Sequence, residues 1–204
     1  MSETARHLVT VEEFLDLPED DTVDVELIDG IVYTSARPLR RHQRVAIELG
    51  YRIGGPFDLD GDGPGGWWIL PDTEVRFGPH DCVAPDLSGW RRERLGAHDE
   101  GPVMDVIPDW VCEVLSPTTA RRDRTAKMRL YARSSVGHLW LVDPVLRTLE
   151  AYRNHDGQWL HLGTWTDGDE PAIPPFEAIR LDVGALFLPL PPDGVAEEGA
   201  SWAP

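Results

Sequence analysis

Lysine and cysteine are scarce in this chain of 204 residues. The 19 basic side chains include one lysine, Lys127, and the others are arginines. The two cysteines, Cys82 and Cys112, lie in strand-like runs and lack the spacing of a metal site. This scarcity excludes a disulfide framework of the secreted type, and it predicts reduced core thiols in a cytoplasmic protein.

Longer patterns are missing as well. No apolar run approaches the roughly 20 residues of a membrane span, and the N-terminus "MSETARHLVTVEEF" lacks the basic and apolar regions of a signal peptide. The G-x-S-x-G turn, the P-loop and the dinucleotide fingerprint are absent, and the seven histidines have no zinc spacing. We therefore expect a globular protein with no membrane partner. No motif in the sequence supports catalysis by a serine or cysteine nucleophile.

The net charge of −17 argues against nonspecific binding of nucleic acid by the whole surface. The arginines nevertheless gather within residues 37–44, 91–94 and 121–133. A solvated helix face is the ordinary interpretation of any one of these clusters. Because all three flank the candidate site described below, they are also compatible with a local anionic partner.

Local patterns predict an α/β fold, close to α+β, in which a sheet is accompanied by few helices. The expected helices cover residues 10–17, 42–53 and 119–134, the first with a capping box at Thr10 and Glu13 and the second ended by Gly54-Gly55. The expected strands are the hairpin "DVELIDGIVYT" with its Asp29-Gly30 turn, "WWIL", "TEVRF", "CVAPDLSGW", residues 109–115, "HLWLVD", "RTLEAYR", "QWLHLGTW" and part of "AIRLDVGALF".

We expect one domain over residues 1–190, followed by a loose Pro-, Gly- and acid-rich tail over residues 191–204. The loop "DLDGDGPGG" begins with the acids of a calcium loop, Asp58, Asp60 and Asp62. Its twelfth position holds Ile69 where a bidentate Glu belongs. We therefore interpret it as a flexible acidic loop.

Two acids stand out because each lies in an apolar run. Asp86 ends "CVAP", and Glu113 lies inside "WVCEVL". Buried acids are costly unless they are paired, hydrogen-bonded or bound to metal, and two carboxylates from neighbouring strands suit Mg²⁺ or Mn²⁺. Either acid alone is equally compatible with an exposed strand position.

The lone lysine supplies a third candidate group. In a helix that begins near Ala120, Lys127 lies one turn after Asp123 on the same face. An ammonium beside a metal-bound water can orient it or stabilise developing charge, whereas the simpler interpretation is a surface ion pair. Glu26 and His42 are weaker candidates for a metal, water or phosphate contact, since a surface acid and a polar helix start explain them equally well.

In combination, "VELIDGIVY", "RHQRVAIEL", "VAPDLSGW", "CEVLSPTTARRDRTAKMRLYARSSVGHLWLVDP" and "LEAYR" resemble the Uma-two family of restriction-endonuclease-like proteins. The resemblance covers about residues 10–188. It implies the PD-(D/E)XK nuclease superfamily, whose members mostly cut DNA with Mg²⁺, and a restriction-endonuclease-like mixed central sheet flanked by helices.

The resemblance also implies roles for residues of this chain. Asp86 and Glu113 match the two metal-binding acids, and the carbonyl of Val114 would face the metal. Leu115 stands where the superfamily has its lysine, and in the Uma-two pattern that lysine is on the following helix, as Lys127. The supporting candidates from the resemblance are Glu26 as a catalytic acid, His42 as a substrate contact and Asp123 as a support for Lys127. Apart from the resemblance, Arg121 and Arg124 of the third arginine cluster are expected to contact the substrate.

These observations predict a Mg²⁺- or Mn²⁺-dependent endonuclease that hydrolyses phosphodiester bonds in DNA, with a homodimer as a possible assembly. The net charge and Leu115 favour a different function, a catalytically weak or inactive module of the same fold that binds nucleic acid or protein. A metal-dependent enzyme acting on a small phosphorylated substrate is a third interpretation, which an acidic surface tolerates better than duplex DNA.

Overall fold

The structure is a computed structural model that describes residues 7–18, 22–37, 39–59, 63–95 and 101–190. Its strands are β1 (Val23–Ile28), β2 (Ile31–Ala36), β3 (Trp67–Pro71), β4 (Val75–Gly78), β5 (Asp81–Val83), β6 (Leu87–Arg91), β7 (Trp110–Val114), β8 (His138–Asp143), β9 (Thr148–His155) and β10 (Gln158–Trp165). Its helices are α1 (Val11–Leu15), α2 (Arg40–Leu49), η1 (Gly50–Gly54), α3 (Gly55–Phe57), α4 (Arg92–Leu95), α5 (Ala120–Arg122), η2 (Asp123–Lys127), α6 (Met128–Arg133) and η3 (Gly184–Leu186).

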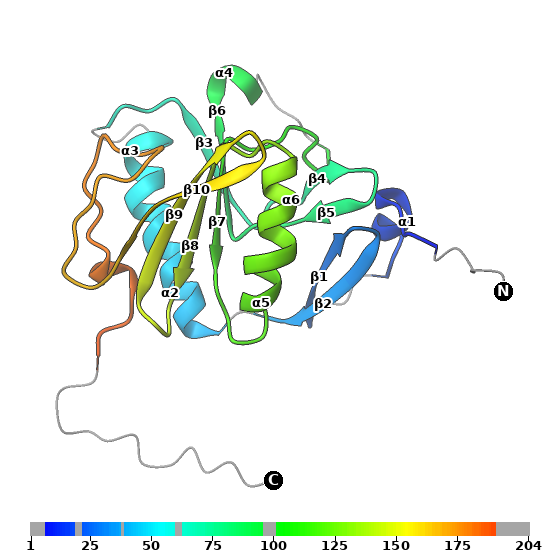
Figure 1. Cartoon of the computed structure of the whole chain (residues 1–204), viewed down its shortest axis with the longest axis horizontal. Helices are drawn as coiled ribbons and strands as arrows, with labels where there is room; N and C mark the ends of the chain where they lie inside the picture. The colour runs from blue at the N-terminus through cyan, green and yellow to red at the C-terminus, as the bar shows by residue number, and fades with distance from the viewer. Residues whose placement is uncertain (1–6, 19–21, 38, 60–62, 96–100, 191–204) are drawn as a thin grey trace, which may run out of the picture.

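The strands form two sheets that lie side by side (Figure 1). A four-stranded antiparallel sheet has the order β2-β1-β5-β4, and a six-stranded sheet has the order β10-β9-β8-β7-β6-β3. In the larger sheet β7 and β8 pair in parallel, whereas their other neighbours are antiparallel. The expected mixed sheet and α/β class are confirmed, with the smaller sheet as an addition. No helix within the described ranges has the length and apolarity to cross a membrane.

Helices cover both faces of the six-stranded sheet (Figure 1). On one face Val45 and Leu49 of α2 pack in the larger core cluster. On the other, Leu130 and Tyr131 of α6 pack in a second cluster that also receives residues of the four-stranded sheet. The second cluster therefore joins the helix after β7 to both sheets.

The structure confirms several predictions that rest on a few neighbouring residues in the sequence. Thr10 and Glu13 form the predicted reciprocal capping box, and α1 ends two residues earlier than expected. Asp29 and Gly30 both adopt positive φ, of 52° and 70°, which is the geometry that a tight hairpin turn requires. Both cysteines are free and buried, as predicted.

The predicted end of the second helix at Gly54-Gly55 is wrong. Both glycines have right-handed helical backbone angles, and the helix continues through η1 and α3 to Phe57. Ile53 and Phe57, four residues apart, are both buried in the larger core cluster. Their burial favours continued helix over the conformational freedom of the glycines.

The run "CVAPDLSGW" is not one strand but two. β5 pairs with β1 and β4, whereas β6 pairs with β3 and β7. Between them Ala84, Pro85 and Asp86 cross from the smaller sheet to the larger one. Proline has no N–H for a ladder, so it marks the crossing.

"AIRLDVGALF" contains the expected short helix, η3, but no strand. The alternating apolar residues Leu181 and Val183 are buried, and their N–H groups bond to the carbonyls of Pro171 and Asp169 in an irregular segment. The alternation of apolar residues in this segment thus reflects their burial and not a strand.

The calcium-like loop lies partly outside the described residues, and its first acid, Asp58, accepts hydrogen bonds from Ile69 and Arg92. The predicted tail over residues 191–204 lies outside them altogether.

Phe176 anchors this irregular segment to the sheet. Its ring centroid lies 4.7 Å from that of Phe57, 4.9 Å from those of Trp67 and Trp110, and 5.7 Å from that of Trp140. We predict that Phe176→Ala lowers the free energy of unfolding by about 3–5 kcal/mol because it leaves a cavity among four aromatic rings. Urea denaturation measures this loss. The exposed Leu146→Ala is the control, and a loss below about 1 kcal/mol for Phe176→Ala would contradict the prediction.

Candidate active site

The alternation of side chains along β7 explains why Glu113 is buried on the helix side of the sheet. Trp110, Cys112 and Val114 belong to the core cluster under α2, whereas Val111 belongs to the cluster under α6. Glu113 shares the face of Val111, because successive strand residues point to opposite faces. Its carboxylate, only 3% exposed, therefore points toward the helix that follows the strand.

Lys127 reaches this carboxylate from the helix. Its Nζ lies 2.9 Å from Oε1 and 3.0 Å from Oε2 of Glu113, and 2.6 Å from Oε1 of Glu26. Asp123, one turn earlier, lies 3.8 Å away. Lys127 is 4% exposed, so the only lysine of the chain is a buried ion-pair partner and not part of a solvated helix face.

The predicted acid Glu26 is brought to the same place by the smaller sheet. It lies on β1 and is 6% exposed, and its Oε2 lies 3.1 Å from Nη2 of Arg122. Arg122 also donates to Oγ of Ser35 on β2. Glu26 on the hairpin thus binds two cations of the helix, Arg122 and Lys127, and these ion pairs join the two elements.

Asp86 and His42 form a second pair at the end of β7. Nε2 of His42 lies 2.9 Å from Oδ1 of Asp86, and the N–H of Val114 donates to Oδ2 at 2.6 Å. The structure thus ties Asp86 to the residue that follows Glu113. Both predicted acids, Asp86 and Glu113, lie at one end of this central strand.

Tyr131 is a site residue that the sequence analysis missed. It is completely buried, and its hydroxyl donates to Oε1 of Glu113. The available signal was its spacing, since Tyr131 lies one helical turn after Lys127, as Lys127 lies one turn after Asp123. This row of polar residues at every fourth position faces the core, where an apolar row is usual.

The two predicted arginine contacts lie outside the cluster. Arg124 makes two bonds to Glu150 on β9, at 2.5 and 3.0 Å, so its guanidinium has a partner within the protein. Arg121 is exposed. The arginine that joins the buried acids is Arg122, which was not among the predicted site residues.

Acids outnumber cations in this buried region, and the pKa values reflect it. Burial raises the pKa of Glu113 well above its usual value although Lys127 opposes the shift, and the charge of Asp86 adds to it. Burial likewise raises the pKa of Asp123. Burial alone would lower the pKa of Lys127, but Glu113 and Glu26 raise it well above its usual value. Lys127 is therefore a permanent cation at neutral pH.

The imidazole of His42 responds in the same direction. Burial would lower the pKa of His42, but the hydrogen bond and the charge of Asp86 outweigh burial and raise it. The charged form of His42 is therefore favoured as long as Asp86 is ionised beside it.

The fit of Asp86 and Glu113 to a divalent cation depends on their donor atoms and on their charge. In the part of the chain that the structure describes, no group of three or more His, Cys, Asp or Glu side chains is placed to hold a metal ion. Burial is the main cause of the raised pKa of Glu113, and the repulsion between Asp86 and Glu113 adds to it. A divalent cation between the two would remove this repulsion, and carboxylate oxygens are ligands that Mg²⁺ and Mn²⁺ prefer. The donor chemistry of the two carboxylates fits such an ion, which would need further oxygen ligands.

In comparisons with known proteins, the chain is similar to one family and to a solved structure. The model of a family described as "Uma2: Putative restriction endonuclease" matches residues 11–184. A crystal structure from Anabaena variabilis ATCC 29413, described as "a putative nuclease belonging to DUF820", superposes with a TM-score of 0.72 at 23% identity. The match covers 88% of this chain and 97% of that one, and it supports the fold. No curated protein matches the chain.

Removing the buried ammonium is expected to destabilise the protein strongly. We predict that Lys127→Met lowers the free energy of unfolding by about 3–5 kcal/mol, because Glu113 and Glu26 lose their shared cation. Urea denaturation checks this at pH 7. The double variant Lys127→Met/Glu113→Gln should recover part of the loss. Wild-type stability in the single variant would mean that the acids do not depend on Lys127.

The raised pKa of Glu113 predicts a pH-dependent gain for Glu113→Gln. The stability that protonated Glu113 contributes is fully present below pH 4.5 and is lost as the pH rises through the higher pKa of the folded state. Glutamine has no such loss. The urea midpoint of the variant, relative to that of the wild type, should therefore be higher at pH 8 than at pH 5. An equal difference at both values would contradict the prediction.

Proposed function

Because the chain belongs to the Uma2 restriction-endonuclease family, as its motifs predicted, we propose that it is a metal-dependent endonuclease that hydrolyses phosphodiester bonds in DNA. The observation that carries the proposal is the meeting of Asp86, Glu113 and Lys127 near the end of β7, with Glu26 and His42 beside them. The nuclease-like fold agrees with it. A homodimer and a cytoplasmic location stay predictions.

Asp86 and Glu113 would hold a Mg²⁺ or Mn²⁺ ion, with the carbonyl of Val114 as the proposed third protein ligand. When bound, such an ion neutralises phosphate charge and lowers the pKa of a coordinated water. The other steps depend on side chains of this chain. The bond from the N–H of Val114 fixes one oxygen of Asp86, and Tyr131 fixes one oxygen of Glu113.

Lys127 would stabilise the negative charge that develops on the phosphate. Its raised pKa keeps it protonated, so it acts as a hydrogen-bond donor and a charge rather than as a base that removes a proton. Leu115, at the usual lysine position, is buried in the apolar cluster under α6. The helix brings Nζ of Lys127 within 3.0 Å of both oxygens of Glu113, so a lysine on the helix replaces one on the strand.

Substrate contacts would come from the edge of this region. His42 lies beside Asp86, and its raised pKa favours a cation near the proposed phosphate position. Arg121 is exposed at the start of the same helix as Lys127. Arg124 requires release from Glu150 before it contacts a phosphate, so it is the weaker candidate.

We predict that Asp86→Ala and Glu113→Ala each lower the rate of cleavage by about a hundredfold or more, since each removes a carboxylate that would hold the metal ion at the reacting phosphate. Cleavage of supercoiled plasmid, linear DNA and RNA in Mg²⁺ or Mn²⁺ measures the rate. The exposed Glu177→Ala is the matched control and should keep wild-type activity. Wild-type rates in both site variants would refute these assignments.

A catalytically inactive binding module is the second candidate. It is favoured by one observation, that all four carboxylate oxygens of Asp86 and Glu113 already have partners within the protein. Calorimetry distinguishes the two. Binding of Mn²⁺ to the wild type that Glu113→Ala abolishes favours the nuclease, and equal heats in both favour the binding module.

A further inference from the structure

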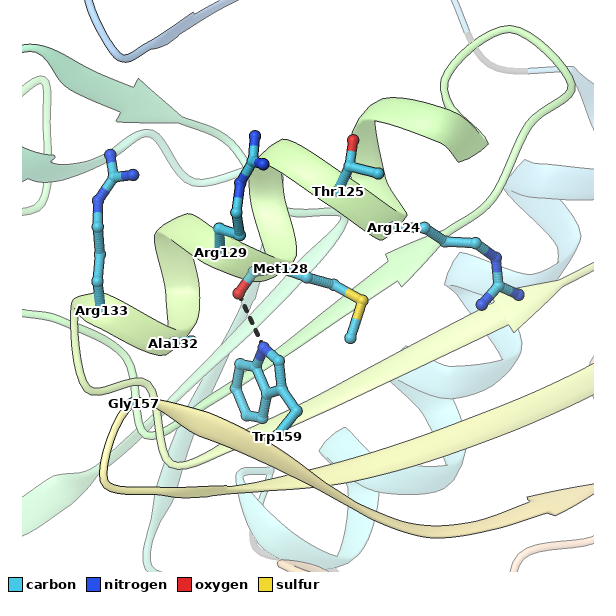
Figure 2. Close-up of a pocket in the computed structure, with 8 residues that line it drawn as sticks. All are labelled: Arg124, Thr125, Met128, Arg129, Ala132, Arg133, Gly157 and Trp159. Atoms are coloured by element: carbon cyan, nitrogen blue, oxygen red, sulfur yellow. Dashed lines mark hydrogen bonds between the residues drawn. The ribbon is translucent and has the colours of Figure 1, made fainter.

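A groove lies along the helix on the side away from the buried acids. Its volume is about 430 Å³, and it runs between α6 and the turn that joins β9 to β10 (Figure 2). The lining includes Arg124, Arg129 and Arg133 and no acidic residue. In a chain with a net charge of −17, a groove with this lining is electrostatically distinct from the average surface.

The three arginines differ in what they already bind. Arg124 is paired with Glu150, and Arg133 is paired with two aspartates at 2.7 and 2.9 Å. Arg129 is exposed, and among the described residues it has no ion-pair or hydrogen-bond partner. Its charge is therefore available to a ligand at no cost in internal contacts.

Arg129 belongs to a ridge of side chains spaced four residues apart. The exposed residues of this ridge are Arg121, Thr125, Arg129 and Arg133. Figure 2 shows Thr125, Arg129 and Arg133 projecting from the same side of the helix. Positions four apart form a row along one helix face, about 6 Å from one to the next. This is close to the spacing of phosphates along an extended nucleic-acid strand, so successive ridge residues suit successive phosphates.

The floor of the groove is apolar and held in place. Nε1 of Trp159 donates to the backbone carbonyl of Met128 at 2.8 Å, and this bond holds the ring against the helix (Figure 2). Both side chains are partly buried against the core cluster under α6. A fixed aromatic ring beside a cation is the combination on which unpaired bases stack while their phosphates are neutralised.

The groove and the candidate active site share one helix. Lys127 and Tyr131 point inward to Glu113, whereas Met128 and Arg129, their neighbours in sequence, face the groove. A strand that follows the ridge toward Arg121 reaches the start of the helix, which immediately follows β7.

We propose that this groove binds a single strand of nucleic acid, with Arg129 and the ridge contacting phosphates and Met128 and Trp159 supporting a base. The nucleic-acid nature of the ligand rests on the proposed function. A duplex carries one charge per 1.7 Å along a broad face and meets the acidic remainder of the surface, whereas one strand fits a narrow groove without acids.

Fluorescence anisotropy with a labelled 15-nucleotide single strand tests the proposal, in EDTA so that cleavage does not intervene. Arg129→Glu should weaken binding about tenfold or more, and Arg129→Ala should reduce the slope of log K against log[salt] by about 0.7. The matched control is Arg153→Glu, which makes the same charge change. Arg153 is exposed on β9 and alternates with Tyr152, so it projects from the sheet face opposite the helix.

The outcomes separate the groove from the nuclease proposal. Equal weakening by Arg129→Glu and Arg153→Glu would show that only net charge matters, and it would overturn the groove proposal. The proposal would also be overturned if the wild type bound no single strand, or if it bound the same sequence more tightly as a duplex. If cleavage depends on Asp86 but the Arg129 variants bind the single strand as the wild type does, the groove proposal is overturned and the nuclease proposal stands. Strand binding that depends on Arg129 in a protein that never cleaves supports the groove and refutes the nuclease.

Discussion

One buried ammonium group fixes the relative positions of three parts of this protein. Lys127 comes from the helix that follows β7, and it binds Glu113 on the central strand and Glu26 on the smaller sheet. Each of these carboxylates alone would be costly in the core, and so would the lysine. Only the assembled arrangement satisfies all three, so the packing of hairpin, helix and strand depends on their charges meeting.

The proposed chemistry would use the same buried charges of Lys127, Glu113 and Glu26. Keeping these charges in the core lowers the stability of the folded protein. Burial raises the pKa of Glu113 and of Asp123, and the neighbouring acids add to the shift although Lys127 opposes it. A region designed only for stability would carry apolar residues there, as Leu115 does one position beyond the strand. Retained repulsion of this kind is typical of sites that act on charged ligands.

Much of the fold was predictable from sequence because its signals are local. The capping box at Thr10, the Asp29-Gly30 turn and the apolar run of β7 need no distant partner. The failures arose where tertiary packing decides. Burial of Phe57 carries a helix through two glycines, and the segment around Leu181 alternates in burial without pairing as a strand. The candidate residues Glu113, Lys127 and Glu26 were also predicted, and so was the approach of Lys127 to Glu113. The contact of Lys127 with Glu26 was not, since no sequence pattern states which hairpin lies beside which helix. Tyr131 and Arg122 were missed because an inward polar side chain on a helix is evident only once the opposite carboxylate is in place.

The crossing at Ala84, Pro85 and Asp86 has a consequence for how activity is acquired during folding. Asp86 lies at the junction of the two sheets, Glu26 belongs to the smaller one and Glu113 to the larger one. Neither sheet alone contains the full set of acids, so an intermediate with only one sheet formed has no complete site. A chain emerging from the ribosome would hold Asp86 and Glu26 long before β7 and Lys127 are synthesised. If the protein cleaves DNA, this topology delays that hazard until both sheets and the helix after β7 have come together.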